Sequence, residues 1–277
     1  MTTPPRLVVL GTGSAFPSRS YNECFIIETE EGRLLVDAGG GNGIINILES
    51  MAIDIATLHD MFVTHSHTDH ILGAVWVVRR IVQLALEDRY EGCLTVYGNA
   101  DVIDALRQIC RLTFLRTYFE KMETTIDFRT VEPGDNARIA GCDVRFIDCH
   151  SANVAQTGFR MSLPEGPTFC CLGDEALTSE NASEVAEADY LVCGAFCRYA
   201  DRTVFRPYEK HHLTVKDVAA TAQLCGIRNL ILAHCEDRTP AALRQPLYAA
   251  EAAHYYNGNV LVPEDGATIS LKPFKTK

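Results

Sequence analysis

Residues 61–70 read MFVTHSHTDH and hold the densest group of chemically active side chains in the sequence. The short apolar run at 61–64 predicts a buried strand. His65 and His67 follow it two residues apart, so in an extended strand end both rings project to the same side. Imidazole nitrogens are common zinc ligands, and this spacing therefore predicts a metal site at the end of the strand.

The same stretch continues with Asp69 and His70, just before a helix predicted to begin at Ile71. Three imidazoles and a carboxylate within six residues can serve two neighbouring metal ions. A polar loop that caps the helix is the alternative interpretation of this cluster.

Three further candidate ligands, His150, Asp174 and His234, each come just past a predicted strand. The carboxyl ends of strands in α/β sheets are where ligand-binding groups gather, so residues distant in sequence can converge there. Each residue alone would be read as an ordinary turn residue. Together with HSHTDH they predict one shared site.

Strands and helices alternate along the whole sequence. Short apolar runs bounded by turn residues predict strands at 7–10, 24–28, 33–36, 61–64, 93–97, 143–148, 168–172, 190–193, 229–233 and 260–262. Helical periodicity indicates helices at 71–86, 100–112, 214–225 and 239–255, the last with Thr239 as N-cap and Pro240 as its first residue. No linker or repeat marks a boundary, so we expect one domain over residues 1–277, of the α/β (α+β) class with helices outside mixed sheets.

Composition narrows the classes of function. A formal charge of -11 argues against broad nucleic-acid binding, and the basic stretch at 107–121 is either a local patch or a solvated helix face. The eleven cysteines include no CxxC pair and sit mainly in apolar runs, which predicts reduced, buried thiols. No apolar run approaches the roughly 20 residues that span a bilayer, and a cytoplasmic protein without a membrane partner is expected.

The series HSHTDH, His150, Asp174 and His234 resembles the ligand signature of the metallo-β-lactamase superfamily, over most of the chain. The resemblance implies a four-layer αββα sandwich. It also implies the site: His65, His67 and His150 hold the first metal, Asp69, His70 and His234 hold the second, Asp174 bridges them, and Asp37 of LLVDAGGG orients the ligands. Two such metals would activate a bridging hydroxide for attack and neutralise charge on the substrate. For Asp37, a turn residue at a strand end is the alternative.

Two further motifs resemble the tRNase Z-like phosphodiesterases of this superfamily. These are LGTGSAFP at 10–17 and KHHLTVKDVAA at 210–220. The second implies that His212 donates a proton to the leaving oxygen, with His211 as a substitute and an exposed loop histidine as the alternative. Thr214 and Asp217 have the spacing of a capping box, which predicts a helix start just after His212.

Two departures set the chain apart from typical members of that group. Only 23 residues separate His150 from Asp174, too few for the protruding arm that binds tRNA. In VCGAF (192–196), Gly194 occupies the place where the resemblance implies a glutamate that supports the catalytic histidine. Glu209 or Asp201 could compensate for the missing glutamate.

We therefore expect a two-metal hydrolase, with Zn as the first choice of metal and Mn or Fe as alternatives. Its expected substrate is a small-molecule or nucleotide-like phosphodiester rather than a full tRNA, and Asp69 and His212 are the expected catalytic residues. The resemblance also implies a homodimer. A lactone, thioester or sulfate-ester hydrolase is the main alternative, because the same hydroxide would attack those bonds. A non-catalytic relative that binds a nucleotide or protein is the alternative from another class.

Overall fold

Two β-sheets face each other in the computed structural model, which describes residues 4–273. The expected domain at 1–277 therefore has its two ends, 1–3 and 274–277, outside the described residues. The first sheet contains, in spatial order, β14 (Thr268–Ser270), β1 (Arg6–Gly11), β2 (Cys24–Glu28), β3 (Arg33–Val36), β4 (Asp60–Phe62), β5 (Leu94–Gly98) and β6 (Ile126–Thr130). The second contains β13 (Asn259–Leu261), β12 (Asn229–Ala233), β11 (Tyr190–Gly194), β10 (Thr168–Cys171), β9 (Thr157–Ser162), β8 (Cys142–Asp148) and β7 (Asn136–Ile139).

Each sheet is antiparallel on one side and parallel on the other. The neighbours from β3 to β6 are parallel in the first sheet, as are those from β10 to β13 in the second. The carboxyl ends of parallel strands meet at one edge of a sheet, and the loops that follow β3, β4, β10 and β12 carry most of the predicted site residues.

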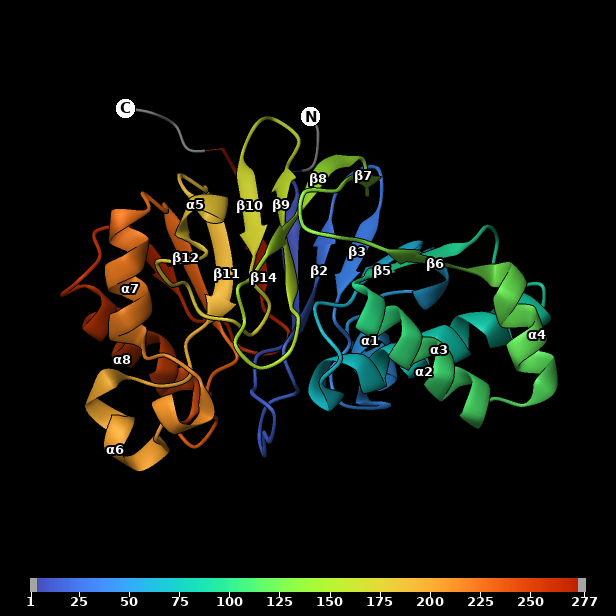
Figure 1. Ribbon diagram of the computed structural model, residues 1–277, viewed down its shortest axis with the longest axis horizontal. Coiled ribbons are helices and arrows are strands. Elements are labelled where there is room, and N and C mark those ends of the chain that lie inside the picture. The colour runs from blue at the N-terminus through green and yellow to red at the C-terminus, as the bar shows by residue number, and fades with distance from the viewer. Residues whose placement is uncertain (1–3, 274–277) are drawn as a thin grey trace.

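Helices cover the outer face of both sheets (Figure 1). The helices are α1 (Gly43–Ser50), α2 (Thr68–Leu86), α3 (Ala100–Thr113), α4 (Arg116–Thr125), α5 (Ala182–Val185), α6 (Arg202–Phe205), α7 (Val215–Leu224) and α8 (Ala241–Ala252), with short 3-10 helices at Ile55–Thr57, Tyr199–Asp201 and Tyr208–Lys210. Apolar side chains of α1 to α4 pack on the first sheet, and those of α7 and α8 pack on the second. This is the αββα sandwich that the resemblance implied.

The central strands of each sheet, such as β11 and β12, are buried on both faces, which explains their continuous apolar sequences. In β12, Leu230 and Leu232 pack toward the helices, whereas Ile231 and Ala233 pack between the two sheets. Successive side chains of a strand point to opposite faces, so a strand between two apolar layers needs apolar residues at every position.

Several sequence expectations are confirmed and two are corrected. The capping box of Thr214 and Asp217 begins α7, and all eleven cysteines are free thiols, nine of them buried. In contrast, α2 begins at Thr68 rather than Ile71, and α8 begins at Ala241 with Pro240 as its N-cap. Pro240 has extended backbone angles (φ -52°, ψ 137°), so it precedes the helix instead of opening it.

The basic stretch at 107–121 forms solvated faces of α3 and α4. Arg107 pairs with Glu123 at 2.9 Å, and Arg116 pairs with Glu120 at 2.7 Å, all with exposed side chains. Within residues 4–273, none of the helices combines the length and apolar character needed to cross a bilayer.

Candidate metal centre and active site

The HSHTDH cluster lies where β4 leads into α2. His67 is the N-cap residue and has extended backbone angles (φ -63°, ψ 150°). Asp69 and His70 lie in the first turn of the helix and are buried. A carboxylate is favourable there, because the N-terminus of a helix carries partial positive charge. The strand end and the first helical turn thus direct their side chains to one place.

Six of the expected ligands form two groups in which one donor atom from each residue lies within 4.8 Å of the others. The first group is His65, His67 and Asp174, and the second is Asp69, His70 and His234. In the first, His65 Nε2 lies 2.9 Å from His67 Nδ1. In the second, Asp69 Oδ2 lies 3.4 Å from the Nε2 atoms of both His70 and His234.

Asp174 lies between the two groups. Its Oδ2 atom is 3.7 Å from His65 Nε2, 3.9 Å from His70 Nε2 and 3.7 Å from His234 Nε2. Asp174 directly follows Gly173, a residue with a φ of +63° that turns the chain after β10. One carboxylate is therefore in reach of both donor groups.

Buried donor atoms at this site lack hydrogen-bond partners among the described residues. They are His70 Nε2 and Asp174 Oδ1. Leaving such an atom unpaired costs about 1–3 kcal/mol, more if it is charged. A divalent cation among these donors would remove that cost, so the residues present fit a bound metal.

The protonation states of His65, Asp69 and Asp174 also suit metal binding. Burial, together with the neighbouring His70, lowers the pKa of His65 to about 3. Burial alone would raise the pKa of Asp174, but His65, His234 and His70 outweigh it and hold that pKa below its usual range. The pKa of Asp69 is lowered in the same way, because the neighbouring His234 and His70 rings outweigh burial. Neutral imidazole and ionised carboxylate are the forms that bind cations.

Asp37 lies directly after β3 and contacts two residues of the site. Its Oδ1 accepts the backbone N–H of Thr64 at 2.8 Å, and its Oδ2 accepts the Thr64 hydroxyl at 2.9 Å and lies 2.8 Å from His70 Nδ1. Burial favours neutral His70, but Asp37 outweighs it and raises the pKa of that ring. The carboxylate thereby fixes the ring so that Nε2 faces the second group.

His150 lies outside both groups. Its backbone φ is +55°, its N–H donates to Asp148 Oδ1 at 2.7 Å, and its side chain is 42% exposed. It lines an open pocket of about 680 Å³ formed with the loop at 151–157. The structure therefore brings together six of the seven expected ligands, and the role of His150 as a ligand stays a prediction.

His212 lies next to the second donor group, in the segment before α7. Its ring centroid is 5.1 Å from that of His234 and 5.1 Å from that of Phe196. Burial and His234 lower the pKa of His212 to about 4, so the free ring is neutral at pH 7.

The residues expected to support His212 lie elsewhere. Glu209 pairs with Arg206 at 3.5 Å, and Asp201 pairs with Arg198 at 2.8 Å. The expectation that one of them compensates for Gly194 is therefore wrong in this structure. His211 is exposed and has a left-handed backbone (φ +61°).

A cavity of about 470 Å³ opens beside His212. Its walls include Phe16, Phe196, Phe205, Lys210 and Arg238. Lys210 Nζ lies 4.7 Å from the centre of the Phe196 ring, and the Arg238 guanidinium lies 5.9 Å from that of Phe205. The cavity thus combines flat apolar surfaces with two cations next to the donor groups.

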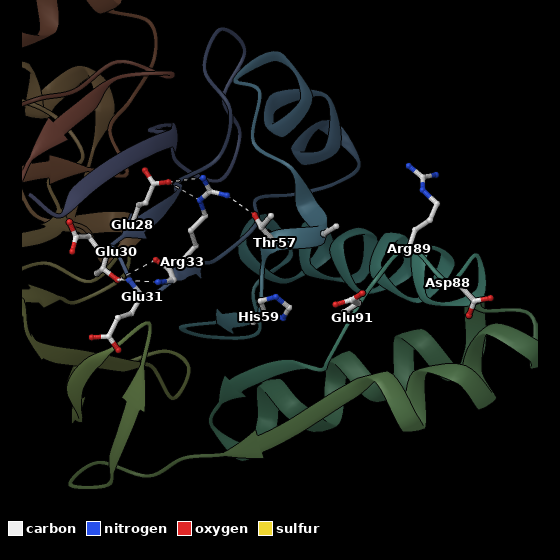
Figure 2. A pocket seen from close by; sticks show the side chains of 12 residues that line it. Glu28, Glu30, Glu31, Arg33, Thr57, His59, Asp88, Arg89 and Glu91 are labelled. Carbon is white, nitrogen blue, oxygen red and sulfur yellow. Dashed lines mark hydrogen bonds and ion pairs between the residues drawn. The ribbon is translucent and has the colours of Figure 1, made fainter. Parts of the chain in front are cut away.

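A second pocket, of about 640 Å³, lies at the other end of the first sheet (Figure 2). Figure 2 shows Arg33 bound to Glu28 and to Thr57, with His59, Asp88 and Glu91 on the remaining walls. These residues flank the ends of β2, β3 and α2 that lie away from the donor groups. Because α2 has 19 residues, its length of roughly 28 Å separates this pocket from the candidate metal centre.

Two residues near the centre were not predicted from the sequence. Glu23 is 2% exposed, and neither of its carboxylate oxygens has a partner among the described residues. Burial raises its pKa well above the usual range, in the neighbourhood of His70 and Asp174. Phe196 is the other. Glu23 directly precedes an apolar strand and Phe196 follows one, and neither position carries a signal in a single sequence.

Comparison with known proteins agrees with this geometry. Ribonuclease Z of Kineococcus radiotolerans is 25% identical over 284 residues, covering 86% of this chain and 85% of that protein. The metallo-β-lactamase fold protein YhfI from Bacillus subtilis matches with a TM-score of 0.77 at 18% identity, covering 96% of this chain and 99% of YhfI. Human tRNase Z, short form, matches with a TM-score of 0.72 at 20% identity, covering 97% of this chain and 100% of that one. The chain has the metallo-β-lactamase fold and is a metal-dependent hydrolase similar to ribonuclease Z.

One protein-family model also matches this chain over most of its length. It is described as Anti-Pycsar protein Apyc1 and matches residues 5–195. The match runs from β1 past the end of β11 and includes HSHTDH and Asp174. It covers well over half of the 277 residues. The chain therefore belongs to the Anti-Pycsar protein Apyc1 family.

Proposed function

We propose that this protein hydrolyses small or flexible phosphodiesters with two divalent metal ions, zinc being the first candidate. The observation that carries the proposal is the position of Asp174, whose Oδ2 lies within 4 Å of histidines from both donor groups. A carboxylate shared in this way is suited to bridge two cations. Relatives named ribonuclease Z support a phosphodiester as the substrate, since ribonucleases cleave that bond.

The ligands divide between the two ions. His65, His67 and Asp174 would hold the first, and Asp69, His70, His234 and Asp174 would hold the second. Two bound ions would supply an activated hydroxide and neutralise charge on the phosphoryl oxygens. The donor groups include neutral and anionic side chains, as zinc sites require. Asp37 keeps the His70 ring oriented during binding.

His212 would act on the leaving group. Its ring lies beside His234 and on the wall of the 470 Å³ cavity, so a substrate in that cavity reaches both the metals and this ring. The free ring is neutral, so it would first take up a proton beside the bound anionic substrate. That proton would go from the imidazolium to the leaving oxygen as the bond from that oxygen to phosphorus breaks. Without that proton the leaving group departs as an alkoxide, which is slow.

The cavity and the chain topology favour a small substrate. The segment between His150 and Asp174 is taken up by β9, β10 and the turn at 163–167, which leaves no room for a protruding arm. Lys210 and Arg238 place two cations on a wall that also includes Glu236 and Asp237. Both of these carboxylates accept backbone N–H groups of neighbouring loop residues, whereas the two cations lie against aromatic rings. An anionic ester with an apolar portion fits this cavity better than a folded RNA does.

The test combines metal content with hydrolysis of bis(p-nitrophenyl) phosphate. Wild type is expected to hold about two ions per chain and to turn over the substrate, with both properties reduced in His67→Ala and Asp174→Ala. His254→Ala, an exposed histidine next to the end of α8, is the control that should change neither. Bound metal with turnover only of lactones, thioesters or sulfate esters would replace the phosphodiester assignment. Protein that binds no metal in any preparation would overturn the proposal.

A further inference from the structure

Phe196 connects the two chain segments that carry His212 and His234. Its backbone N–H donates to the carbonyl of Leu213 at 3.0 Å, next to His212. Its carbonyl accepts the backbone N–H of Glu236 at 2.7 Å, two residues after His234. The backbone of Phe196 is therefore held between the two segments. Its Cα atom, from which the ring extends, has a fixed position relative to both.

The ring of Phe196 lies flat against the imidazole of His212. The two ring planes differ by 20° and their centroids are 5.1 Å apart. Lys210 Nζ lies 4.7 Å from the centre of the same Phe196 ring. Only 8% of Phe196 is exposed, so its own rotation is restricted by the surrounding protein. His212 therefore has two ring neighbours, Phe196 stacked on it and His234 tilted against it.

None of the described carboxylates forms a hydrogen bond to the His212 ring. Gly194, the last residue of β11, shows why this strand carries no such carboxylate. A Cβ atom at Gly194 would lie 2.0 Å from the carbonyl oxygen of Asp174. Any side chain there would displace the backbone of the residue placed between the two donor groups. Position 194 therefore cannot carry an acidic support for His212, and the stack on Phe196 is its contact with the segment that follows β11.

We propose that Phe196 is a positioning residue that orients the His212 imidazole toward the leaving oxygen of the substrate. This inference rests on the proposed function, in which His212 donates a proton. In that step a hydroxide oxygen forms a bond to phosphorus, the bond from phosphorus to the leaving oxygen breaks, and the electron pair of that oxygen takes a proton from the His212 imidazolium, which becomes a neutral imidazole. A flat neighbour restricts rotation of the imidazole about its side-chain bonds, whereas a branched aliphatic side chain does not.

The kinetic test compares two diaryl substrates of similar shape. Phe196→Leu is expected to lower kcat for diphenyl phosphate, which has the poorer leaving group, by about tenfold or more. With bis(p-nitrophenyl) phosphate, whose leaving group needs little protonation, the loss should stay within about threefold. KM and metal content should not change. Phe196→Tyr keeps the ring and should restore the rate, and Phe196→Leu should cause no further loss in a His212→Ala background.

A second measurement does not depend on turnover. In the zinc-loaded protein, the ring protons of His212, identified by their loss in His212→Ala, should resonate upfield because the Phe196 ring lies over them. Phe196→Leu should move these signals downfield, and Phe196→Tyr should leave them in place. Phe114→Leu is the matched control, since Phe114 is 9% exposed and lies at the corner between α3 and α4.

The outcomes separate the inference from the proposed function. Equal rate losses with both substrates, or unchanged His212 signals in Phe196→Leu, would overturn the positioning role of Phe196. If wild type binds metal but hydrolyses neither substrate, the phosphodiesterase proposal fails and the proton-donor part of the inference fails with it. The His212 signals would then still decide whether Phe196 orients the ring.

Discussion

Asp37 Oδ2 lies 2.8 Å from His70 Nδ1, and both residues are buried. The same carboxylate accepts hydrogen bonds from the backbone and the hydroxyl of Thr64, the residue before His65. Asp37 thus connects the end of β3 with the strand end and the helical turn that carry the donor groups. Asp37 therefore orients ligands of the candidate metal site and is not one of them.

Replacing Asp37 with asparagine tests this role. Asp37→Asn keeps the size of the side chain but removes the charge that holds His70, and metal affinity should fall by about 10–100-fold. Competition with a chromophoric chelator would measure that affinity. Asp127→Asn, on the exposed side of β6, is the control. Equal affinities in wild type and Asp37→Asn would show that His70 keeps its orientation without the carboxylate.

The prediction that His150 binds the first metal requires its loop to move. In the structure His150 contacts Asp148 at the surface. If zinc draws the His150 ring into the site, the loop becomes more ordered, so addition of zinc should slow amide hydrogen exchange at 149–156. His150→Ala should weaken binding of one metal ion, while His254→Ala should not. Unchanged exchange and unchanged affinity would mean that His65, His67 and Asp174 are the complete protein ligand set of the first ion.

Gly194 provides a test of close packing at the centre. Gly194→Ala places a methyl group 2.0 Å from the carbonyl oxygen of Asp174, so the backbone of one strand end must shift. We expect a loss of about 1–3 kcal/mol in the free energy of unfolding, together with reduced metal content. Gly41→Ala is the matched control, because a Cβ atom at Gly41 meets no atom within 4 Å. Normal metal content in Gly194→Ala would show that the Asp174 backbone has room to move.

Asp237 fixes the loop that follows Phe16. Its carboxylate predicts a dependence of folding stability on pH. Its carboxylate accepts backbone N–H groups from Ser18, Arg19 and Ser20. Burial would raise its pKa, but these hydrogen bonds outweigh it and lower the pKa in the folded state. The stabilisation is therefore present above the unfolded pKa of about 3.9 and is lost as the pH falls through the folded value.

Asp237→Asn should accordingly lower stability at pH 7 by about 2 kcal/mol. The difference from wild type should shrink in the most acidic solutions, where the wild-type carboxyl is also neutral. Urea unfolding of both proteins at neutral and acidic pH would measure it. A difference that is constant with pH would show that the ionised form contributes nothing special to holding the loop.

Apolar runs in the sequence predicted the strands whose burial depends only on their own residues. The buried strands were predicted because they lie between two apolar layers and are apolar throughout. β9 was missed because it includes Gly158, which packs closely on the Cys171 carbonyl, and Arg160, whose guanidinium reaches the Ala186 carbonyl at 3.0 Å. Such residues interrupt an apolar run, and only the tertiary structure shows how they are accommodated.

The candidate site follows the same division. HSHTDH was predicted from spacing alone, and Asp174 and His234 from their position after strands. The role inferred for Phe196 had no sequence signal, because an aromatic residue after an apolar run looks like any core residue. The ring stack forms between residues that are brought together by β11 and the segment before α7. The cytoplasmic location, the homodimer and the identity of the metal stay predictions.

The two sheets contribute different numbers of donor residues to the candidate metal centre, and those of the first sheet come earlier in the chain. His65, His67, Asp69 and His70 follow β4 of the first sheet, whereas Asp174 and His234 follow strands of the second. During synthesis, an emerging chain that has completed the first sheet up to β6 holds only a partial set of donors. It gains the shared carboxylate late and the last imidazole later still. We therefore expect tight binding of a divalent metal to depend on completion of the second sheet, and a truncated or stalled chain to release the metal readily.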